Sequence, residues 1–154
     1  MRARFIAGDP RIGAQFDRIR REVICRPRDR AKLAREIVDM RRRIEEAAEG
    51  GVDLKRERGG IVDIEFMVQY LALSAAAEHP ALADWTDNVR ILDTAAREGL
   101  LPADVANGLK DAYLALRTES HRAALDLPDD ARAREVLDRY RSFVRGEWQQ
   151  LFGE

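Results

Sequence analysis

The stretch IVDIEFMVQYLALSAAA, from Ile61 to Ala77, decides the fold class, because apolar side chains occupy almost every side of the helix that it would form. A helix on the surface of a globular protein keeps one polar face in water, whereas a helix that is apolar all round is buried. We therefore expect residues 61–77 to form the buried central helix of an all-α protein.

Two helices are expected before this centre. Asp9 and Pro10 form a helix-start signal, and apolar residues then recur at helical spacing until Pro27. A second helix begins at the capping residue Asp29, ends near the glycines at 50 and 51, and carries the run RRRIEE at 41–46. We expect this run to be a solvated face in which Arg41 pairs with Glu45. The apolar stripes are Ile12, Phe16, Ile19 and Val23 in the first helix and Leu33, Ile37, Met40 and Ile44 in the second.

Three helices are expected after the centre. Thr86 caps a short helix that stops at Gly99, Pro102 opens the next one, and Pro128 separates that helix from the last. The stripes of these helices are Val89, Leu92 and Ala96; Val105, Leu109, Tyr113 and Leu116; and Leu137, Tyr140, Val144, Trp148 and Leu151. The sequence shows no strand pattern and no internal repeat. It predicts a single helical domain over residues 1–154, built as a bundle of about six helices.

Composition narrows the classes of partner. The 154 residues include 27 basic and 28 acidic side chains, which leave a net charge of -1. Such a balance gives no overall attraction to nucleic acid or to an anionic membrane, so neither is expected as a partner. An anion site in this protein would have to be local.

The single cysteine, Cys25, excludes an internal disulfide and a cysteine metal cluster, and it suits a reducing compartment. The first residues lack an apolar run of signal-peptide length, and no segment approaches 18 consecutive apolar residues. We expect a cytoplasmic protein.

The loop KRERGG, residues 55–60, leads directly into the central helix and admits two interpretations. In the functional one, Gly59 and Gly60 let the backbone approach an anion, the helix N-terminus offers its amides, and Lys55, Arg56 and Arg58 supply positive charge. In the structural one, Gly60 is the N-cap and Asp63, three residues later, satisfies free amides of the first turn.

Asp63 and Glu65 resemble a pair of metal-binding carboxylates, but two helical positions place them about 200° apart around the axis. A D-x-D pair needs a strand to turn both acids to one side, and the chain contains no such pair. We therefore expect neither a metal site nor a catalytic residue here. Glu65 aligns with Gln69 one turn later, and these polar groups should bond to neighbouring helices or face another domain.

The run DLKRERGGIVDIEFMVQYLAL, residues 53–73, resembles the signature of the helical domain that follows a nucleotidyltransferase domain in the glutamine synthetase adenylyltransferase family. The run RARFIAGDPRIGAQFDRIRREV, residues 2–23, and the closing segment 148–152 also resemble the C-terminal end of that enzyme. The family pattern has a glycine where this sequence has Glu57, which adds an acid to the basic loop.

The resemblance implies that this chain is the last helical domain of an enzyme that transfers AMP from ATP to a tyrosine of glutamine synthetase. In that family ATP is the AMP donor, and Mg²⁺ is held by strand-borne carboxylates of the nucleotidyltransferase domain. Since the chain lacks that motif, the resemblance implies that it is inactive alone and that its partner is an upstream nucleotidyltransferase domain. Glutamine synthetase, the PII protein and glutamine are the further implied partners.

Three roles for the chain remain open on the sequence. The one we favour has residues 55–69 complete the catalytic cleft of the nucleotidyltransferase domain, with Lys55 and Arg58 on phosphate and Asp63 or Glu65 orienting the loop. In the second, the bundle is a regulatory module that docks the PII protein, glutamine or glutamine synthetase. In the third, the chain is a stand-alone helical scaffold for a partner helix.

Overall fold

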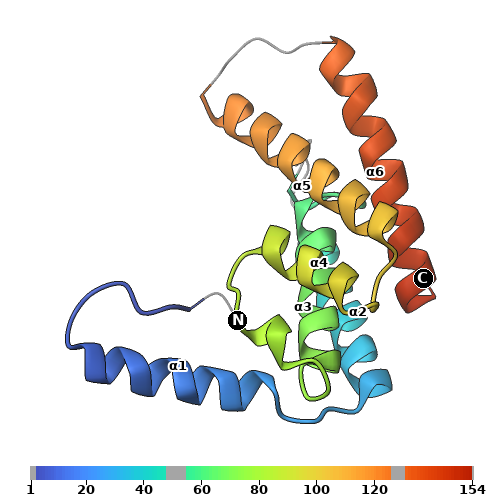
Figure 1. Ribbon diagram of the computed structural model, residues 1–154. Helices are drawn as coiled ribbons and strands as arrows, with labels where there is room; N and C mark the ends of the chain where they lie inside the picture. Colours follow the sequence, from blue (N-terminus) through green and yellow to red (C-terminus); the bar gives the residue numbers. More distant parts are fainter. Residues whose placement is uncertain (1–2, 48–54, 126–130, 154) are drawn as a thin grey trace.

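The computed structural model describes residues 3–47, 55–125 and 131–153, and in these ranges the chain is helical, without a strand (Figure 1). The all-α prediction is confirmed. The α-helices are α1 (Pro10–Ile24), α2 (Arg30–Glu46), α3 (Ile61–Ala75), α4 (Asn88–Arg97), α5 (Ala103–Ala124) and α6 (Ala131–Phe152), with a short 3-10 helix, η1 (Pro80–Ala83). Among the described helices, none combines the length and the apolar character that crossing a membrane requires.

Helix α3 lies at the centre, as its all-round apolar sequence predicts. It contacts α2, α4, α5, α6 and η1, and Ile64, Val68 and Ala72 are fully buried. The helix ends at Ala75 with Ala76 as its C-cap, two residues earlier than predicted. The rest of the core comes from the helices around it and includes Leu82, Leu92, Leu109, Leu116 and Val144.

The helix starts follow the predicted capping signals with one exception. The side chains of Asp9 and Asp29 accept hydrogen bonds from the amides of Arg11 and Lys32 at the starts of α1 and α2. Helix α4, however, is capped by Asp87, whose side chain accepts from the amide of Arg90, and not by Thr86. The predicted signals at the glycines 50 and 51 and at Pro128 lie outside the described residues.

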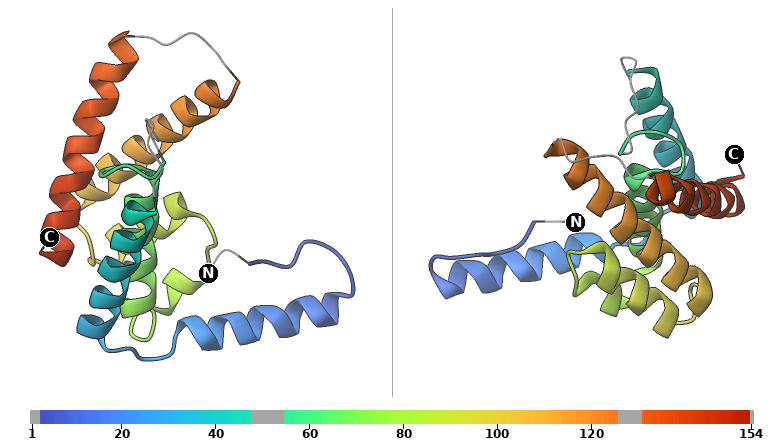
Figure 2. Two further views of the ribbon diagram at one scale, coloured as in Figure 1. Left: turned by 180° about the vertical axis from the view of Figure 1, so that it is seen from behind. Right: turned by 90° about the horizontal axis from the view of Figure 1, so that it is seen from above.

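Helix α1 differs from the others in its position. It projects sideways from the bundle, as the views in Figure 2 show, and the segment before it runs back along it toward the bundle. Its predicted apolar stripe is not part of the core, because Ile12, Ile19 and Val23 are exposed. The spacing therefore predicts the helix correctly but does not show what covers its apolar side.

Candidate functional site

The 55–60 loop is held at the start of α3 by Asp63. One carboxylate oxygen accepts a hydrogen bond from the amide of Gly59 at 2.6 Å, and the other accepts from the Nε of Arg41 in α2. Gly60 is the N-cap and has no side-chain cap bond of its own. Asp63 therefore binds the residue before the N-cap and not an amide of the first turn, and it also ties the loop to α2.

Arg41 and Asp63 are both 1% exposed, which makes them the most deeply buried ion pair among the described residues. Arg41 also donates through Nη2 to the carbonyl of Arg56 at 2.9 Å, so the same side chain holds the loop at a second point. Burial raises the pKa of the Asp63 carboxyl above its usual value of 3.8, although Arg41 and the Gly59 amide oppose that change. The prediction that RRRIEE is a solvated face is wrong at Arg41, because this residue turns inward.

The other acid of that prediction, Glu45, serves the loop as well. Arg58 donates from Nη2 to Glu45 at 2.7 Å and from Nε to both carboxylate oxygens at 3.1 Å. The hydrogen bond from Arg58 lowers the pKa of Glu45. Glu45 thus pairs with Arg58 instead of Arg41, and Arg58 is fixed along α2.

Helix α6 also binds the loop. Arg141 forms an ion pair with Glu57, and Arg145 donates to the carbonyl of Arg58 at 3.4 Å. Glu57 therefore binds the loop to α6. Its carboxylate pairs with Arg141 of α6 and has a structural role in addition to its effect on the charge of the loop.

Gly59 allows α6 to come this close. Its φ is +76°, a left-handed conformation that favours glycine. A Cβ atom at this position would lie 2.3 Å from the carbonyl oxygen of Arg141. The glycine is therefore required both by the turn and by the packing of α6 against it.

The remaining predicted site residues lie on the outside of this arrangement. Lys55 and Arg56 are exposed at the start of the loop, whereas Glu65 and Gln69 are half-buried on α3. With Val62 and Leu73, which are also half-buried and recur at helical spacing, they form a strip that we call the open strip of α3. The strip runs from Val62, close to the loop in sequence, to Leu73 near the C-terminal end of α3.

The described residues contain no group of three or more His, Cys, Asp or Glu side chains that could hold a metal ion. At the loop, each carboxylate is directed to an arginine: Asp63 to Arg41, Glu45 to Arg58 and Glu57 to Arg141. These acids are therefore occupied in fixing the loop. The loop presents Lys55 and Arg56, which suit an anion such as a phosphate group.

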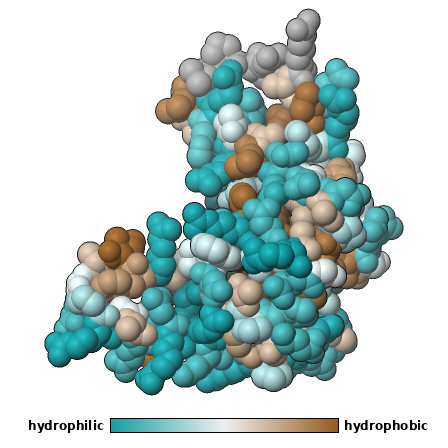
Figure 3. Space-filling model, in the orientation of Figure 1, coloured by the Kyte–Doolittle hydropathy of each residue, from teal (hydrophilic) through white to brown (hydrophobic). Residues whose placement is uncertain are grey.

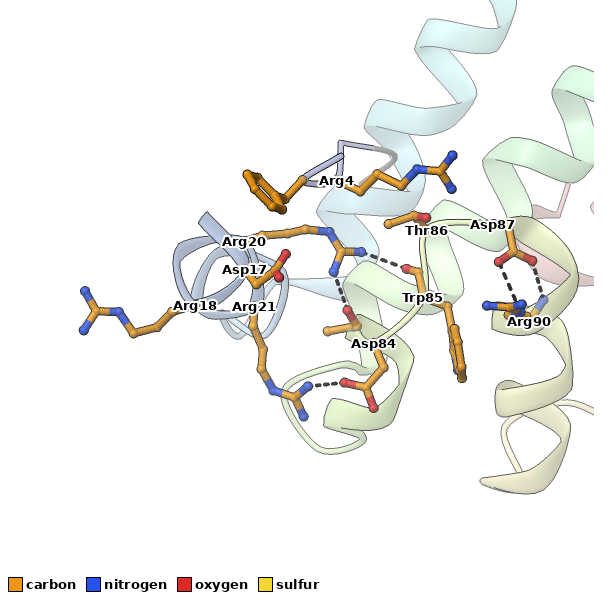
Figure 4. Close-up of a pocket in the computed structure, with 12 residues that line it drawn as sticks. Arg4, Asp17, Arg18, Arg20, Arg21, Asp84, Trp85, Thr86, Asp87 and Arg90 are labelled. Atoms are coloured by element: carbon orange, nitrogen blue, oxygen red, sulfur yellow. Dashed lines mark hydrogen bonds and ion pairs between the residues drawn. The ribbon is translucent and has the colours of Figure 1, made fainter. Parts of the chain in front are cut away.

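A cavity of about 700 Å³ lies elsewhere, between α1 and the corner formed by η1 and the start of α4 (Figure 4). Arg20 reaches from α1 and donates to the carbonyls of Ala83 at 2.6 Å and Trp85 at 2.8 Å, while Arg21 pairs with Asp84. Arg90 stacks over the ring of Trp85. The contacts of Arg20 and Arg21 fix α1 to the body, and local sequence patterns did not reveal them because the partners lie more than 60 residues apart.

A comparison with family models matches residues 30–144 of this chain to the family described as GlnD PII-uridylyltransferase. The chain belongs to this family. The matched range runs from the first residue of α2 into α6, so it contains α3 and the whole 55–60 loop. The match leaves out α1 and residues 145–152 of α6.

The curated relatives that match this family member are bifunctional glutamine synthetase adenylyltransferase/adenylyl-removing enzymes. Identity is 44% with the protein of Nitrosococcus oceani over 98% of this chain, 43% with that of Burkholderia pseudomallei over 99% of this chain, and 40% with that of Hahella chejuensis over 100% of this chain. The chain spans only 16–17% of the length of these relatives. The predicted resemblance to a helical domain of this enzyme class is therefore confirmed.

Proposed function

We propose that this chain is the helical part of an enzyme that transfers AMP from ATP to a tyrosine of glutamine synthetase and thereby regulates nitrogen assimilation in the cytoplasm. Support comes from relatives of that name that are at least 40% identical over nearly the whole chain. Because the chain corresponds to a sixth or so of those relatives, we assign the chemical step to a separate nucleotidyltransferase domain.

The observation that carries this proposal is the fixed geometry of the 55–60 loop. Arg41, Asp63 and Arg141 bind its backbone or its side chains from three helices, and Lys55 and Arg56 stay exposed at its start. Preorganised cations stabilise a negatively charged transition state more than mobile ones, because no reorganisation is needed during the reaction. The loop is therefore suited to contact the phosphates of ATP at the edge of a cleft completed by the other domain.

ATP fits the loop better than Mg²⁺ does. The exposed Lys55 and Arg56 offer the charge that phosphate groups need, whereas the nearby carboxylates are engaged by arginines. We therefore place Mg²⁺ on carboxylates of the nucleotidyltransferase domain. In this arrangement the chain alone transfers no AMP.

The open strip of α3 is the surface that we assign to the domain contact. A central helix surrounded by five other elements would be expected to be buried on all sides, yet Val62, Glu65, Gln69 and Leu73 remain half-buried. The strip mixes apolar and polar side chains, which is typical of contacts between domains of one enzyme. A domain seated there would lie beside the loop cations.

A chimera tests the proposal: the Nitrosococcus oceani relative in which this chain replaces the region that it matches. Transfer of radioactive AMP from ATP to glutamine synthetase should occur with the chimera, but neither with the chain alone nor with the relative lacking the region. Labelling by the chain alone would overturn the proposal. A relative that keeps its full basal rate without the region, and loses only its response to PII protein or glutamine, would identify the bundle as a regulatory module instead.

A further inference from the structure

Helix α1 carries an apolar face that the bundle leaves uncovered. Ile12, Ile19 and Val23 are 64%, 47% and 42% exposed, and the half-buried Phe16 recurs at the same helical spacing. We call these four residues the α1 face. A contiguous apolar stripe of this length on the outside of a protein marks a contact surface more often than a solvated one.

The segment before the helix enlarges this surface. Ile6 is 82% exposed, and the ring of Phe5 packs on α1 at Gly13, where a Cβ atom would lie 2.8 Å from it. In Figure 3 hydrophobic residues gather on the arm formed by α1 and this segment. The apolar surface therefore continues from the helix onto the segment that folds back along it.

The orientation of α1 is fixed, so the surface is presented in a defined direction. Arg20 and Arg21 hold the helix to the η1–α4 corner by the bonds described above. At its end, Arg28 donates to the carbonyls of Val23 at 2.7 Å and Ile24 at 2.8 Å and reaches the carbonyl of Leu73 in α3. A helix with so many attachments at its C-terminal half is a rigid projection of the body.

The two kinds of comparison indicate what covers the face. The family model begins at residue 30, after α1, whereas the adenylyltransferase relatives match 98–100% of the chain and so include α1. Helix α1 therefore lies outside the stretch that the family model matches, as do residues 145–152 of α6, but inside the stretch that aligns with the adenylyltransferase relatives. This chain spans only 16–17% of those relatives, so they contain further chain that is available to cover the apolar face.

We infer that the α1 face, extended by Phe5 and Ile6, is a contact surface for the nucleotidyltransferase domain. It adds to the contact that the open strip of α3 makes with the same domain. This inference rests on the proposed function and names a second surface for the same partner. Apart from Arg20 and Arg21, which bind the body, residues 9–26 contain three arginines and three carboxylates, so the complementary surface is apolar with a rim of mixed charge. The partner domain would thus be held both by the bundle and by its projecting helix.

Hydrogen–deuterium exchange tests the inference in the isolated chain and in the chimera. Amides of α1 should exchange at least about tenfold more slowly in the chimera, because the partner domain covers the helix there. The double variant Ile12→Glu/Ile19→Glu should abolish this added protection and leave the helicity of the isolated chain unchanged. Its matched control is Ala14→Glu/Arg18→Gln, which changes the net charge equally on the other side of α1 and should keep the protection.

Two results would overturn the inference. One is equal exchange of α1 in the isolated chain and in a chimera that transfers AMP, which would leave the proposed function intact. The other is a concentration-dependent dimer of the isolated chain that protects α1 and is lost in the Ile12→Glu/Ile19→Glu variant, which would make a second copy the occupant. A chimera that protects α1 but transfers no AMP would instead contradict the proposed function alone.

Discussion

Asp63 of α3 and Arg41 of α2 form a buried ion pair that also fixes the backbone of the loop between their helices, since Asp63 binds the Gly59 amide and Arg41 binds the Arg56 carbonyl. The pair is therefore both part of the core and the foundation of the candidate site. Stability and loop geometry should depend on it together.

Removing one partner of this pair should strongly destabilise the protein. Asp63→Ala leaves the Arg41 charge buried without compensation, which costs about 3–5 kcal/mol in such settings. Urea unfolding followed by circular dichroism measures the change. Glu78→Ala, which removes an exposed ion pair with Arg30, is the control and should have little effect. If Asp63→Ala is as mild as the control, the buried pair does not support the fold.

The pH dependence of stability should differ in sign between Asp63 and Glu45. Because the pKa of Asp63 is raised in the folded state, its contribution is complete below about pH 3.9 and is lost as the pH rises through the folded pKa. Because the pKa of Glu45 is lowered, its contribution is present above its unfolded value and is lost as the pH falls through the folded pKa.

Two neutral variants measure these contributions. From about pH 4 to about pH 7 the stability advantage of the wild type over Asp63→Asn should shrink, whereas below about pH 4.5 its advantage over Glu45→Gln should diminish as the pH falls. Urea unfolding at each pH gives both differences. An advantage over Asp63→Asn that grows with pH would show that Arg41 outweighs burial in setting the pKa of Asp63.

Two glycines with similar backbone conformations should respond differently to alanine. Gly59 has a φ of +76° and Gly99 a φ of +71°, but only Gly59 faces a backbone oxygen where a Cβ would go. Gly99→Ala should cost about 1–2 kcal/mol for the left-handed conformation alone. Gly59→Ala should cost clearly more, because α6 must also move. Equal unfolding free energies for the two variants would show that α6 does not press on the loop.

Glu57 and Arg141 should be energetically coupled. The two side chains are mostly buried and bind the loop to α6. A double-mutant cycle with Glu57→Gln and Arg141→Gln should give a coupling of about 1 kcal/mol that decreases in high salt. A coupling near zero would mean that the loop is held by Arg41 and Asp63 without help from α6.

The sequence predicted the central helix and the role of Gly60 because both follow from local chemistry: all-round apolarity and a glycine before a first turn. It failed at Arg41, which stands among three consecutive arginines that look equivalent. A signal was present, since Arg41 lies four residues after the buried Ile37 and continues its stripe, whereas the predicted stripe residue Met40 is 47% exposed. The burial of the Arg41 side chain becomes evident only in the folded structure, where Asp63 of α3 lies next to it.

The role of α1 could be predicted only in part for a similar reason. Periodicity shows that a helix has an apolar side, but not whether that side meets its own bundle or another domain. The contacts that orient α1 join Arg20 and Arg21 to η1 and its C-cap, and a third contact joins Arg28, beyond the end of α1, to α3; no local pattern indicates such pairs. For Lys55 and Arg56, the sequence shows the charge, and the structure adds the rigid loop that carries it.

The role of the loop in nucleotide transfer is measured most directly by the rate of AMP transfer to glutamine synthetase by the chimera with Lys55 and Arg56 both replaced by alanine. We expect a loss of at least about tenfold relative to the unchanged chimera, because positioned cations near phosphate are removed. Lys32→Ala, which removes an exposed cation of α2 away from the loop, should keep the rate. An unchanged rate in the Lys55→Ala/Arg56→Ala chimera, with its fold intact by circular dichroism, would contradict the claim that this loop takes part in nucleotide transfer.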